Sequence, residues 1–261
     1  MTVKDRAVVV TGGGTGIGRA ISELFAAKGA RVIVNYSRSK QDADDTVKAI
    51  QAKGGTAVAV PADVSKQAQA KALMDAAITE FGRLDYLVNN AGWSQRVPHH
   101  QMDDLTDEIW NRVFETNLRG AFYCVRAAAP LLKKQPGAAI VNIASVAALM
   151  GQGSSMAYAA SKGGMVTLTK SLARALAPEI RVNAVLPGFV RTRFAGWPDS
   201  AFTDAEKITP LRHLATVDDV AEATLFFAAH AMGTTGETLV IDGGAATLGP
   251  SSAEFSATPR S

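Results

Sequence analysis

The sequence predicts an α/β fold: a single, mostly parallel sheet of seven strands with helices on both faces. Seven short apolar segments alternate with longer segments of helical periodicity, which is typical of a doubly wound sheet with right-handed crossovers. A glycine-rich turn, TGGGTGIG at 11–18, joins the first apolar segment to a helical one. The chain has 261 residues, 47% of them apolar, so it can bury a large core. We expect residues 1–249 to form one domain.

The expected strands are apolar runs bounded by turn residues. They lie at 6–10, 31–35, 57–61, 84–88, 138–143, 181–186 and 238–242. Each strand except the last precedes a segment with helical spacing of its apolar residues, and these segments are 17–29, 39–53, 66–81, 104–134, 156–177 and 217–231. Thr106 and Thr216 are typical N-terminal caps, and Asp219 follows Thr216 at the spacing of a capping box.

One segment, 189–216, interrupts the alternation. It separates the sixth strand from the next helix and contains Phe194, Trp197, Phe202 and two prolines. Long loops in compact domains are usually lids or binding loops, so we interpret this segment as a substrate lid. The alternative is that its aromatic rings only pack on the core. Residues 250–261 are mostly small and polar, which predicts a flexible tail or an arm that lies on a neighbouring subunit.

Charge and hydropathy exclude several classes of function. The net charge is +3, but the basic residues are scattered and form no block of five, so we predict no nucleic-acid partner. No apolar run approaches the ~20 residues of a membrane helix, and we expect a soluble, cytosolic protein without a membrane partner.

The cysteine and histidine residues indicate no metal site. Cys124 is the only cysteine and lies in an apolar helical segment, which predicts a buried structural thiol. The four histidines show neither HxxxH nor HExxH spacing. We therefore predict that the protein provides no metal ligands.

Three polar residues near the middle of the chain predict an acid/base site. Ser145 precedes Tyr158 by 13 residues, and Lys162 follows Tyr158 by four. A spacing of four places Tyr158 and Lys162 on one face of a helix, where the ammonium favours the phenolate. A phenol needs this help, because its ordinary pKa is roughly 10. A serine hydroxyl on the same face could hydrogen-bond a substrate oxygen, so the three residues indicate chemistry on a carbonyl or an alcohol.

The glycine turn predicts a dinucleotide site. Residues 4–36 read as strand, turn, helix and strand, and the start of a helix after such a turn is a natural site for a pyrophosphate. The spacing of Gly12, Gly16 and Gly18 departs from GxGxxG, and the glycines could serve only tight strand-to-helix packing. The acid/base residues further along the chain favour the dinucleotide interpretation.

Several motifs occur together in a fixed order: TGGGTGIG (11–18), Asp63-Val64, NNAG (89–92), Asn117, Ser145, YAASK (158–162) and PGFVRT (187–192). In order and spacing they resemble the short-chain dehydrogenase/reductase family over about residues 3–246. RVNAVLPG (181–188) and VIDGG (240–244) are similar to the branch that holds 3-oxoacyl-carrier-protein reductases and bacterial glucose or secondary-alcohol dehydrogenases. The resemblance implies a Rossmann-like fold and hydride transfer.

The resemblance also implies a role for each matching residue. Tyr158 would exchange a proton with the substrate oxygen and Ser145 would orient that oxygen. Lys162 would lower the pKa of Tyr158 and bind the nicotinamide ribose, and Asn117 would hold a water in a proton relay to Lys162. The expected cofactor-binding residues besides Tyr158 and Lys162 are Gly12, Thr15, Gly16, Ile17, Gly18, Asn35, Tyr36, Ser37, Arg38, Asp63, Val64, Asn90, Ala91, Gly92, Pro187, Gly188, Val190 and Thr192. The candidate substrate residues besides Ser145 and Tyr158 are Trp93, Ser94, Val146, Gln152, Phe189, Phe194 and Trp197.

The end of the second strand predicts the cofactor. A carboxylate there would accept hydrogen bonds from the ribose 2′-OH of NAD and repel the 2′-phosphate of NADP. This chain has Asn35-Tyr36-Ser37-Arg38 instead, and Arg38 offers a forked donor for phosphate. Thr15 argues the other way, because many NADP-preferring relatives carry a basic residue there. We predict NADP(H), with NAD(H) as the second cofactor that the chain could use.

We therefore predict an oxidoreductase that transfers hydride between NADP(H) and a small ketone or secondary alcohol. The alternatives are a 3-oxoacyl-carrier-protein reductase and, in another class, a non-catalytic dinucleotide-binding sensor. The apolar bias of the candidate substrate residues argues against a heavily hydroxylated sugar. Segments 104–134 and 156–177 carry more apolar residues than one contact face needs. In the family such helices pair with their copies, which implies a homotetramer.

Overall fold

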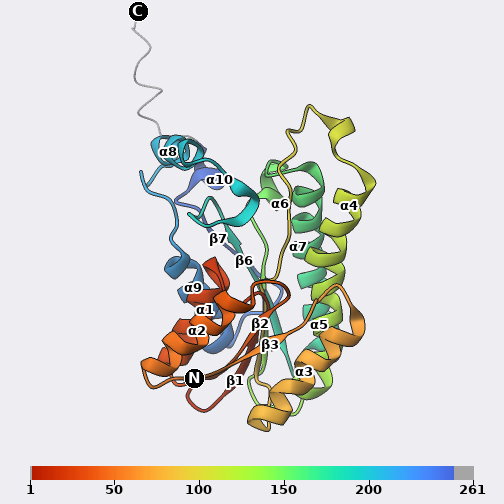
Figure 1. Ribbon diagram of the computed structural model, residues 1–261, viewed down its shortest axis with the longest axis vertical. Coiled ribbons are helices and arrows are strands. Elements are labelled where there is room, and N and C mark those ends of the chain that lie inside the picture. Colours follow the sequence, from red (N-terminus) through yellow and green to blue (C-terminus); the bar gives the residue numbers. More distant parts are fainter. Residues whose placement is uncertain (1, 250–261) are drawn as a thin grey trace, which may run out of the picture.

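The computed structural model describes residues 2–249, and they form a three-layer arrangement of helices, sheet and helices (Figure 1). The strands are β1 (Ala7–Val10), β2 (Arg31–Tyr36), β3 (Thr56–Pro61), β4 (Tyr86–Asn89), β5 (Ala139–Ile143), β6 (Arg181–Pro187) and β7 (Thr238–Ile241). They form one sheet in the order β3-β2-β1-β4-β5-β6-β7, and every pairing in this sheet is parallel. The predicted seven-stranded doubly wound sheet is confirmed.

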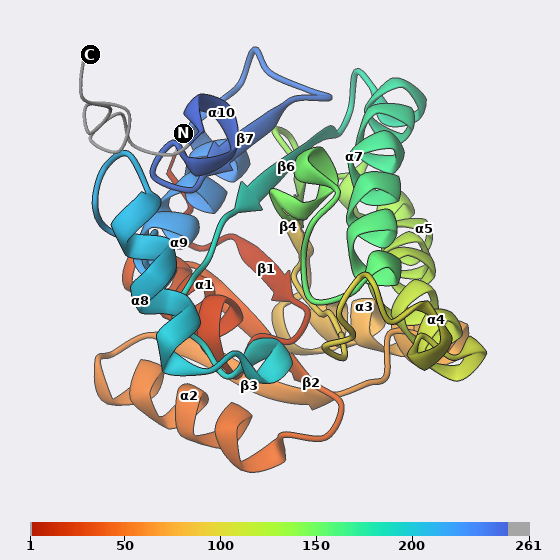
Figure 2. The same cartoon turned by 90° about the horizontal axis from the view of Figure 1, so that it is seen from above.

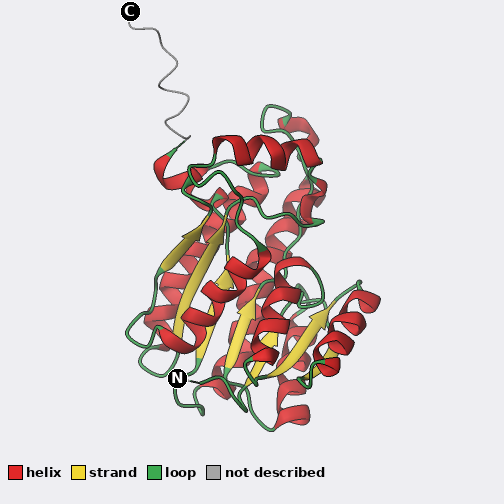
Figure 3. Ribbon diagram, turned by 90° about the vertical axis from the view of Figure 1, so that its left-hand side faces the viewer, coloured by secondary structure: helices red, strands yellow, loops and turns green. Residues whose placement is uncertain are grey.

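Helices cover both faces of the sheet (Figures 2 and 3). The α-helices are α1 (Gly16–Ala27), α2 (Lys40–Ala52), α3 (Gln67–Phe81), α4 (Asp107–Phe114), α5 (Gly120–Leu132), α6 (Ala147–Met150), α7 (Met156–Leu176), α8 (Asp199–Ile208), α9 (Val217–Leu225) and α10 (Ala245–Leu248). One core packs α1, α2 and α9 on the sheet, and a second packs α3, α5 and α7 on the opposite face. Because both faces are covered, β1, β4, β5 and β6 are buried along their whole length, which explains why most of their residues are apolar.

The two N-terminal caps that the sequence predicts, Thr106 and Thr216, are confirmed. The side chain of Thr106 accepts a hydrogen bond from the backbone of Ile109 and begins α4. Thr216 and Asp219 form a complete capping box at the start of α9.

Cys124 is fully buried, and burial raises the pKa of its thiol to about 12, so it is a structural residue and not a nucleophile.

The segment 104–134, expected to be helical, is helical from Asp107 to Leu132, but it is not one regular α-helix. A short 3-10 turn (Met102–Asp104) comes first, and a π-helical turn (Glu115–Arg119) separates α4 from α5. A π turn adds a residue to the helix and thereby changes which side chain points inward. Here Asn117, a polar residue, is fully buried and makes hydrogen bonds inside the protein. Helical periodicity alone cannot reveal this local change.

The lid segment also contains more regular structure than the sequence predicts. It holds a 3-10 turn (Phe194–Gly196) and α8, and both follow β6 directly at the top of the sheet. A second π turn (Phe226–His230) extends α9. None of the helices in residues 2–249 is long and apolar enough to cross a membrane. The predicted tail at 250–261 lies outside the described residues.

Candidate active site

A cavity of about 1150 Å³ opens at the carboxyl ends of the strands. The strand order reverses between β1 and β4, and ligands of open parallel sheets bind where such a reversal leaves a crevice. The cavity is bordered by the glycine turn, the ends of β5 and β6, the first turns of α7 and the lid. Ser145, Tyr158 and Lys162 all line it, so the fold brings the three predicted acid/base residues together.

Helix α7 positions Tyr158 and Lys162. The helix begins at Ser155, whose side chain accepts a hydrogen bond from the backbone N–H of Tyr158 at 3.2 Å. One turn further on, Lys162 is 4% exposed and its Nζ donates to the carbonyl oxygen of Ile143 at 2.8 Å. The same Nζ lies 5.6 Å from the centre of the Tyr158 ring. The ammonium is therefore held beside the phenol by the end of β5.

Burial sets the protonation of this pair. It raises the pKa of Tyr158 to about 12, although a hydrogen bond with Ser145 acts in the opposite direction. Burial also lowers the pKa of Lys162 to about 8. Both shifts have one cause, because a poorly solvated site disfavours the phenolate and the ammonium alike. In the free protein near neutral pH, Tyr158 is a proton donor and Lys162 is still charged.

The pKa values predict opposite pH dependences for the two directions of reaction. The pKa of Lys162 is lowered, so its charge is lost as the pH rises through about 8, and kcat/KM for carbonyl reduction should fall there. Alcohol oxidation needs Tyr158 to accept a proton, so its rate should rise with pH. Pairs of pH profiles, one for each direction, measure this. A reduction rate that increases through the same range would contradict the assignment of Lys162.

Asn117 lies behind the wall of the cavity. Its Oδ1 accepts from the backbone N–H of Trp93 at 2.7 Å, and its Nδ2 donates to the Trp93 carbonyl and to Ser161 Oγ, both at 3.1 Å. Ser161 Oγ in turn donates to the carbonyl of Tyr158. The side chain thus connects the 93–105 loop to α7. These contacts favour a positioning role, and the predicted water relay stays a prediction.

The glycine turn fits a pyrophosphate closely. Gly12 and Gly16 have φ values of +61° and +50°, which L side chains rarely adopt, and a Cβ at Gly18 would lie 2.1 Å from the carbonyl oxygen of Gly12. Thr15 precedes α1, but no side chain caps the first backbone N–H groups of that helix. Free N–H groups and the helix dipole together attract an anion. Gly12, Thr15, Gly16 and Ile17 line the cavity, whereas Gly18 is buried beneath the turn.

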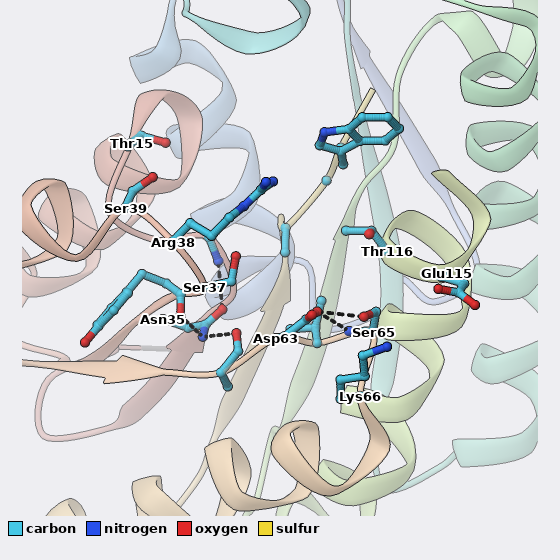
Figure 4. Close-up of a pocket in the computed structure, with 18 of the residues that line it drawn as sticks. Thr15, Asn35, Ser37, Arg38, Ser39, Asp63, Ser65, Lys66, Glu115 and Thr116 are labelled. Carbon is cyan, nitrogen blue, oxygen red and sulfur yellow. Dashed lines mark hydrogen bonds between the residues drawn. The ribbon is translucent and has the colours of Figure 1, made fainter. Parts of the chain in front are cut away.

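A second pocket, of about 400 Å³, lies beyond the turn at the ends of β2 and β3 (Figure 4). It brings together the residues predicted to bind the adenosine: Asn35, Tyr36, Ser37, Arg38, Asp63 and Val64. Arg38 extends into this pocket in Figure 4. The carboxylate of Asp63 accepts hydrogen bonds from the backbone and side chain of Ser65 at 3.0 and 2.7 Å.

The buried side chain of Asn35 supports the glycine turn. It is 2% exposed, its Oδ1 accepts from the N–H of Gly12, and its Nδ2 donates to the carbonyls of Tyr36, Val60 and Ala62. Its side chain therefore holds the glycine turn beside the smaller pocket that it helps to line, and the cofactor contact predicted for Asn35 stays a prediction. Asn90 acts similarly, since its Nδ2 donates to the carbonyls of Thr11 and Gly12.

The remaining cofactor candidates line the larger cavity: Asn90, Ala91, Gly92, Pro187, Gly188, Val190 and Thr192. Five of the substrate candidates line it as well: Val146, Gln152, Phe189, Phe194 and Trp197. Trp93 and Ser94 do not. The Trp93 ring belongs to the smaller pocket, and the Ser94 hydroxyl is bound to that of Ser154 at 2.6 Å. Both residues follow Gly92. The course of the loop there decides which pocket each side chain faces, and no sequence pattern predicts that course.

Aromatic contacts and one surface ion pair order the segment 189–216 at the cavity. The Phe194 ring lies 5.7 Å from the ring of Tyr158, and Phe189 packs against Trp197 at 5.2 Å. Arg193 forms an ion pair with Asp42 on α2 at 2.8 Å, but the two side chains are 77% and 38% exposed. Exposed pairs contribute only about 0–1 kcal/mol, so this ion pair adds little to the stability of the segment.

The structure adds pocket residues that sequence reasoning missed. His99, Met150, Ser154 and Leu214 line the larger cavity, and Ser39, Ser65, Lys66, Arg112, Glu115 and Thr116 line the smaller one. Most lie outside the motifs. Arg112 is one of the scattered basic residues, and helical spacing gives no reason to separate it from the others.

Comparisons with known proteins agree with this site. A model of the protein family described as Enoyl-(Acyl carrier protein) reductase matches residues 12–246. The chain is 40% identical over 240 residues to a ketoacyl reductase of the granaticin polyketide synthase from Streptomyces violaceoruber, covering 91% of this chain and 94% of the relative. It is 40% identical over 250 residues to 3beta-hydroxysteroid dehydrogenase 1 from Eggerthella lenta, covering 93% and 94%.

Comparison with a solved structure supports the same fold. A short-chain dehydrogenase/reductase from Burkholderia xenovorans superimposes with a TM-score of 0.85 and 35% identity, over 90% of this chain and 95% of the other. The family match, the relatives and the Rossmann-like sheet all agree with the residues gathered in the cavity. The chain belongs to the short-chain dehydrogenase/reductase family and is an oxidoreductase that acts on CH–OH and C=O groups with a nicotinamide cofactor.

Proposed function

We propose that the protein is an NADP(H)-dependent reductase of a largely apolar ketone. The observation that carries this proposal is the half-buried Tyr158 in the cavity wall, which keeps its proton at neutral pH beside a charged Lys162. The cofactor, when bound, supplies hydride to the carbonyl carbon. Tyr158 donates its proton to the carbonyl oxygen, and Ser145 hydrogen-bonds the same oxygen. Lys162 stabilises the phenolate that remains.

The walls of the cavity support an apolar substrate. Phe189, Phe194, Trp197 and Phe202 line its lid side, and Met150 lines the opposite rim. Such a surface suits a ring or an acyl chain better than a sugar. A 3-oxoacyl thioester carried by acyl-carrier protein is the second candidate, and the identity to a ketoacyl reductase favours it. Segment 189–216 is the proposed lid, and a cytosolic location is part of the same proposal.

A panel of ketones, 3-oxoacyl thioesters and secondary alcohols tests this function. Each compound is followed at the absorbance of reduced nicotinamide with NADPH and with NADH. Turnover of an apolar ketone with NADPH is expected. Turnover of the thioesters alone would select the second candidate. Binding of the cofactor without turnover of any compound would favour the sensor over an enzyme.

The proposed NADPH preference depends on Arg38. Replacing Arg38 by Ala should weaken NADPH binding by about 1.5–3 kcal/mol, roughly ten- to a hundredfold, because a charged hydrogen bond to phosphate is lost. NADH binding should hardly change. Lys40→Ala is the matched control, because Lys40 lies two residues away and pairs with Asp44 on the surface of α2. Equal losses for both cofactors would mean that Arg38 does not contact the phosphate. Asn35→Asp is a poor test, since an aspartate cannot donate to the three carbonyls that Asn35 binds.

We also propose a homotetramer. Trp110 and Phe122 on α4 and α5 are 41% and 38% exposed, which is unusual for large rings on a monomer. β7 is at the end of the strand order, so one of its edges is open to a copy of itself. Light scattering at micromolar concentration should give a mass near four chains of 27.3 kDa. The mass of a single chain would refute both proposed interfaces, the one through α4 and α5 and the one through β7. Twice that mass would leave only one of them.

A further inference from the structure

Arg112 is placed where its charge faces the smaller pocket. It lies on α4, and its guanidinium carbon is 4.0 Å from the centre of the Trp93 ring. A cation–π contact at this distance restricts the side chain. Both residues line the pocket that Arg38 enters from the end of β2. Two arginines from opposite walls therefore share one small space.

Asp63 also lines this pocket, but neither arginine forms an ion pair with it. Among residues 2–249, no carboxylate forms an ion pair with Arg38 or Arg112. Glu115, which also lines the pocket, is paired with Arg119. Loss of solvation lowers the pKa of Arg112, and the positive charge of Arg38 lowers it further, more than Asp63 raises it. The pocket thus presents a net positive field at a place where both guanidiniums are exposed to a ligand.

We infer that Arg112 and Arg38 form a two-sided clamp for a phosphate monoester on the adenosine ribose, with Trp93 as the platform that positions Arg112. This inference rests on the proposed NADP(H) preference and adds its second determinant. A phosphate carries nearly two negative charges and three acceptor oxygens, so it can accept forked hydrogen bonds from two guanidiniums and remove their mutual repulsion. Trp93, expected from the sequence to contact substrate, takes part in cofactor selection instead.

Two other roles for Arg112 would affect the binding of NADPH and NADH differently from the clamp. If its guanidinium stacked on the adenine base, it would contribute equally to NADPH and NADH, because both carry the base. If it were only part of the α4 surface, its removal would change neither. Selective loss of ligands that carry a 2′-phosphate is the result specific to the clamp.

Calorimetric titration with two nucleotide fragments isolates the clamp from the chemistry of the enzyme. The probes are adenosine 2′,5′-bisphosphate and 5′-AMP, which differ by the ribose phosphate alone. Arg112→Ala should weaken the bisphosphate about tenfold and 5′-AMP less than about twofold, as expected for one charged hydrogen bond. Arg112→Met keeps the aliphatic packing on Trp93 and should behave alike, so a folding defect in the first variant leaves the test intact. Lys40→Ala is the control for loss of one positive charge.

The outcomes separate the clamp from the cofactor proposal on which it rests. If the parent protein prefers the bisphosphate and Arg112→Met keeps that preference, the clamp is refuted while NADP(H) selection by Arg38 stands. Equal weakening of both probes would also refute the clamp. A parent protein without preference for the bisphosphate would overturn both proposals. Trp93→Ala should reproduce part of the loss, and Trp93→Phe should restore the affinity, because a phenyl ring can still carry the guanidinium.

Discussion

Replacing Tyr158 by phenylalanine is expected to lower kcat by about 10²–10⁴-fold or more in both directions of the reaction. The change removes the transferable proton and keeps the ring, and general acid–base catalysis typically contributes that factor. The ring contact with Phe194 at 5.7 Å is retained, so the lid should still close. Steady-state kinetics give kcat, and fluorescence titration gives cofactor affinity, which should change little.

Tyr86 provides a matched control for this experiment. Its hydroxyl is buried and has no hydrogen-bond partner among the described residues, far from the cavity lining. Tyr86→Phe removes the same oxygen from a tyrosine without touching the site, and a buried polar group without a partner is costly to keep. Full activity and equal or higher thermal stability are expected. Activity of Tyr158→Phe within a few-fold of the parent enzyme would show that another group donates the proton.

Replacing Lys162 by methionine is the second change with a large expected effect. The ammonium lies 5.6 Å from the Tyr158 ring and is anchored on Ile143, so the variant loses the charge that stabilises the phenolate. kcat should fall by about 10²-fold or more, and KM for the nicotinamide cofactor should rise, because the same group is assigned to the ribose. The decline of reduction above a pH of about 8 should disappear with it.

The pH profile makes this prediction more specific than loss of activity. Methionine has a similar length and removes the unfavourable burial of a charge, so the variant should fold. Lys170→Met is the control, since Lys170 is exposed on the same helix two turns further on. A Lys162→Met enzyme that keeps the same decline with pH would assign the titration to a different group.

The sequence by itself determined the sheet, the glycine turn and the pair on α7. Parallel strands that are buried on both faces are mostly apolar, so β1, β4, β5 and β6 can be recognised in the sequence as predominantly apolar runs. The turn can be recognised in the sequence because residues other than glycine rarely adopt the φ values of Gly12 and Gly16. Tyr158 and Lys162 share a helix, and a spacing of four fixes their common face without any tertiary contact.

Tertiary structure alone decided which side chains share a pocket. Trp93 and Arg112 are on different elements, and their contact depends on how α4 crosses the loop after Gly92. The π turn that buries Asn117 changes the helical phase locally, and no periodic pattern records it. Asn35 lines the smaller pocket as the sequence predicts, but its four hydrogen bonds could not be predicted, because β3 brings the carbonyls of Val60 and Ala62 beside it. Each of these contacts joins residues distant in sequence, so its geometry is set by packing between elements and not by the pattern within one.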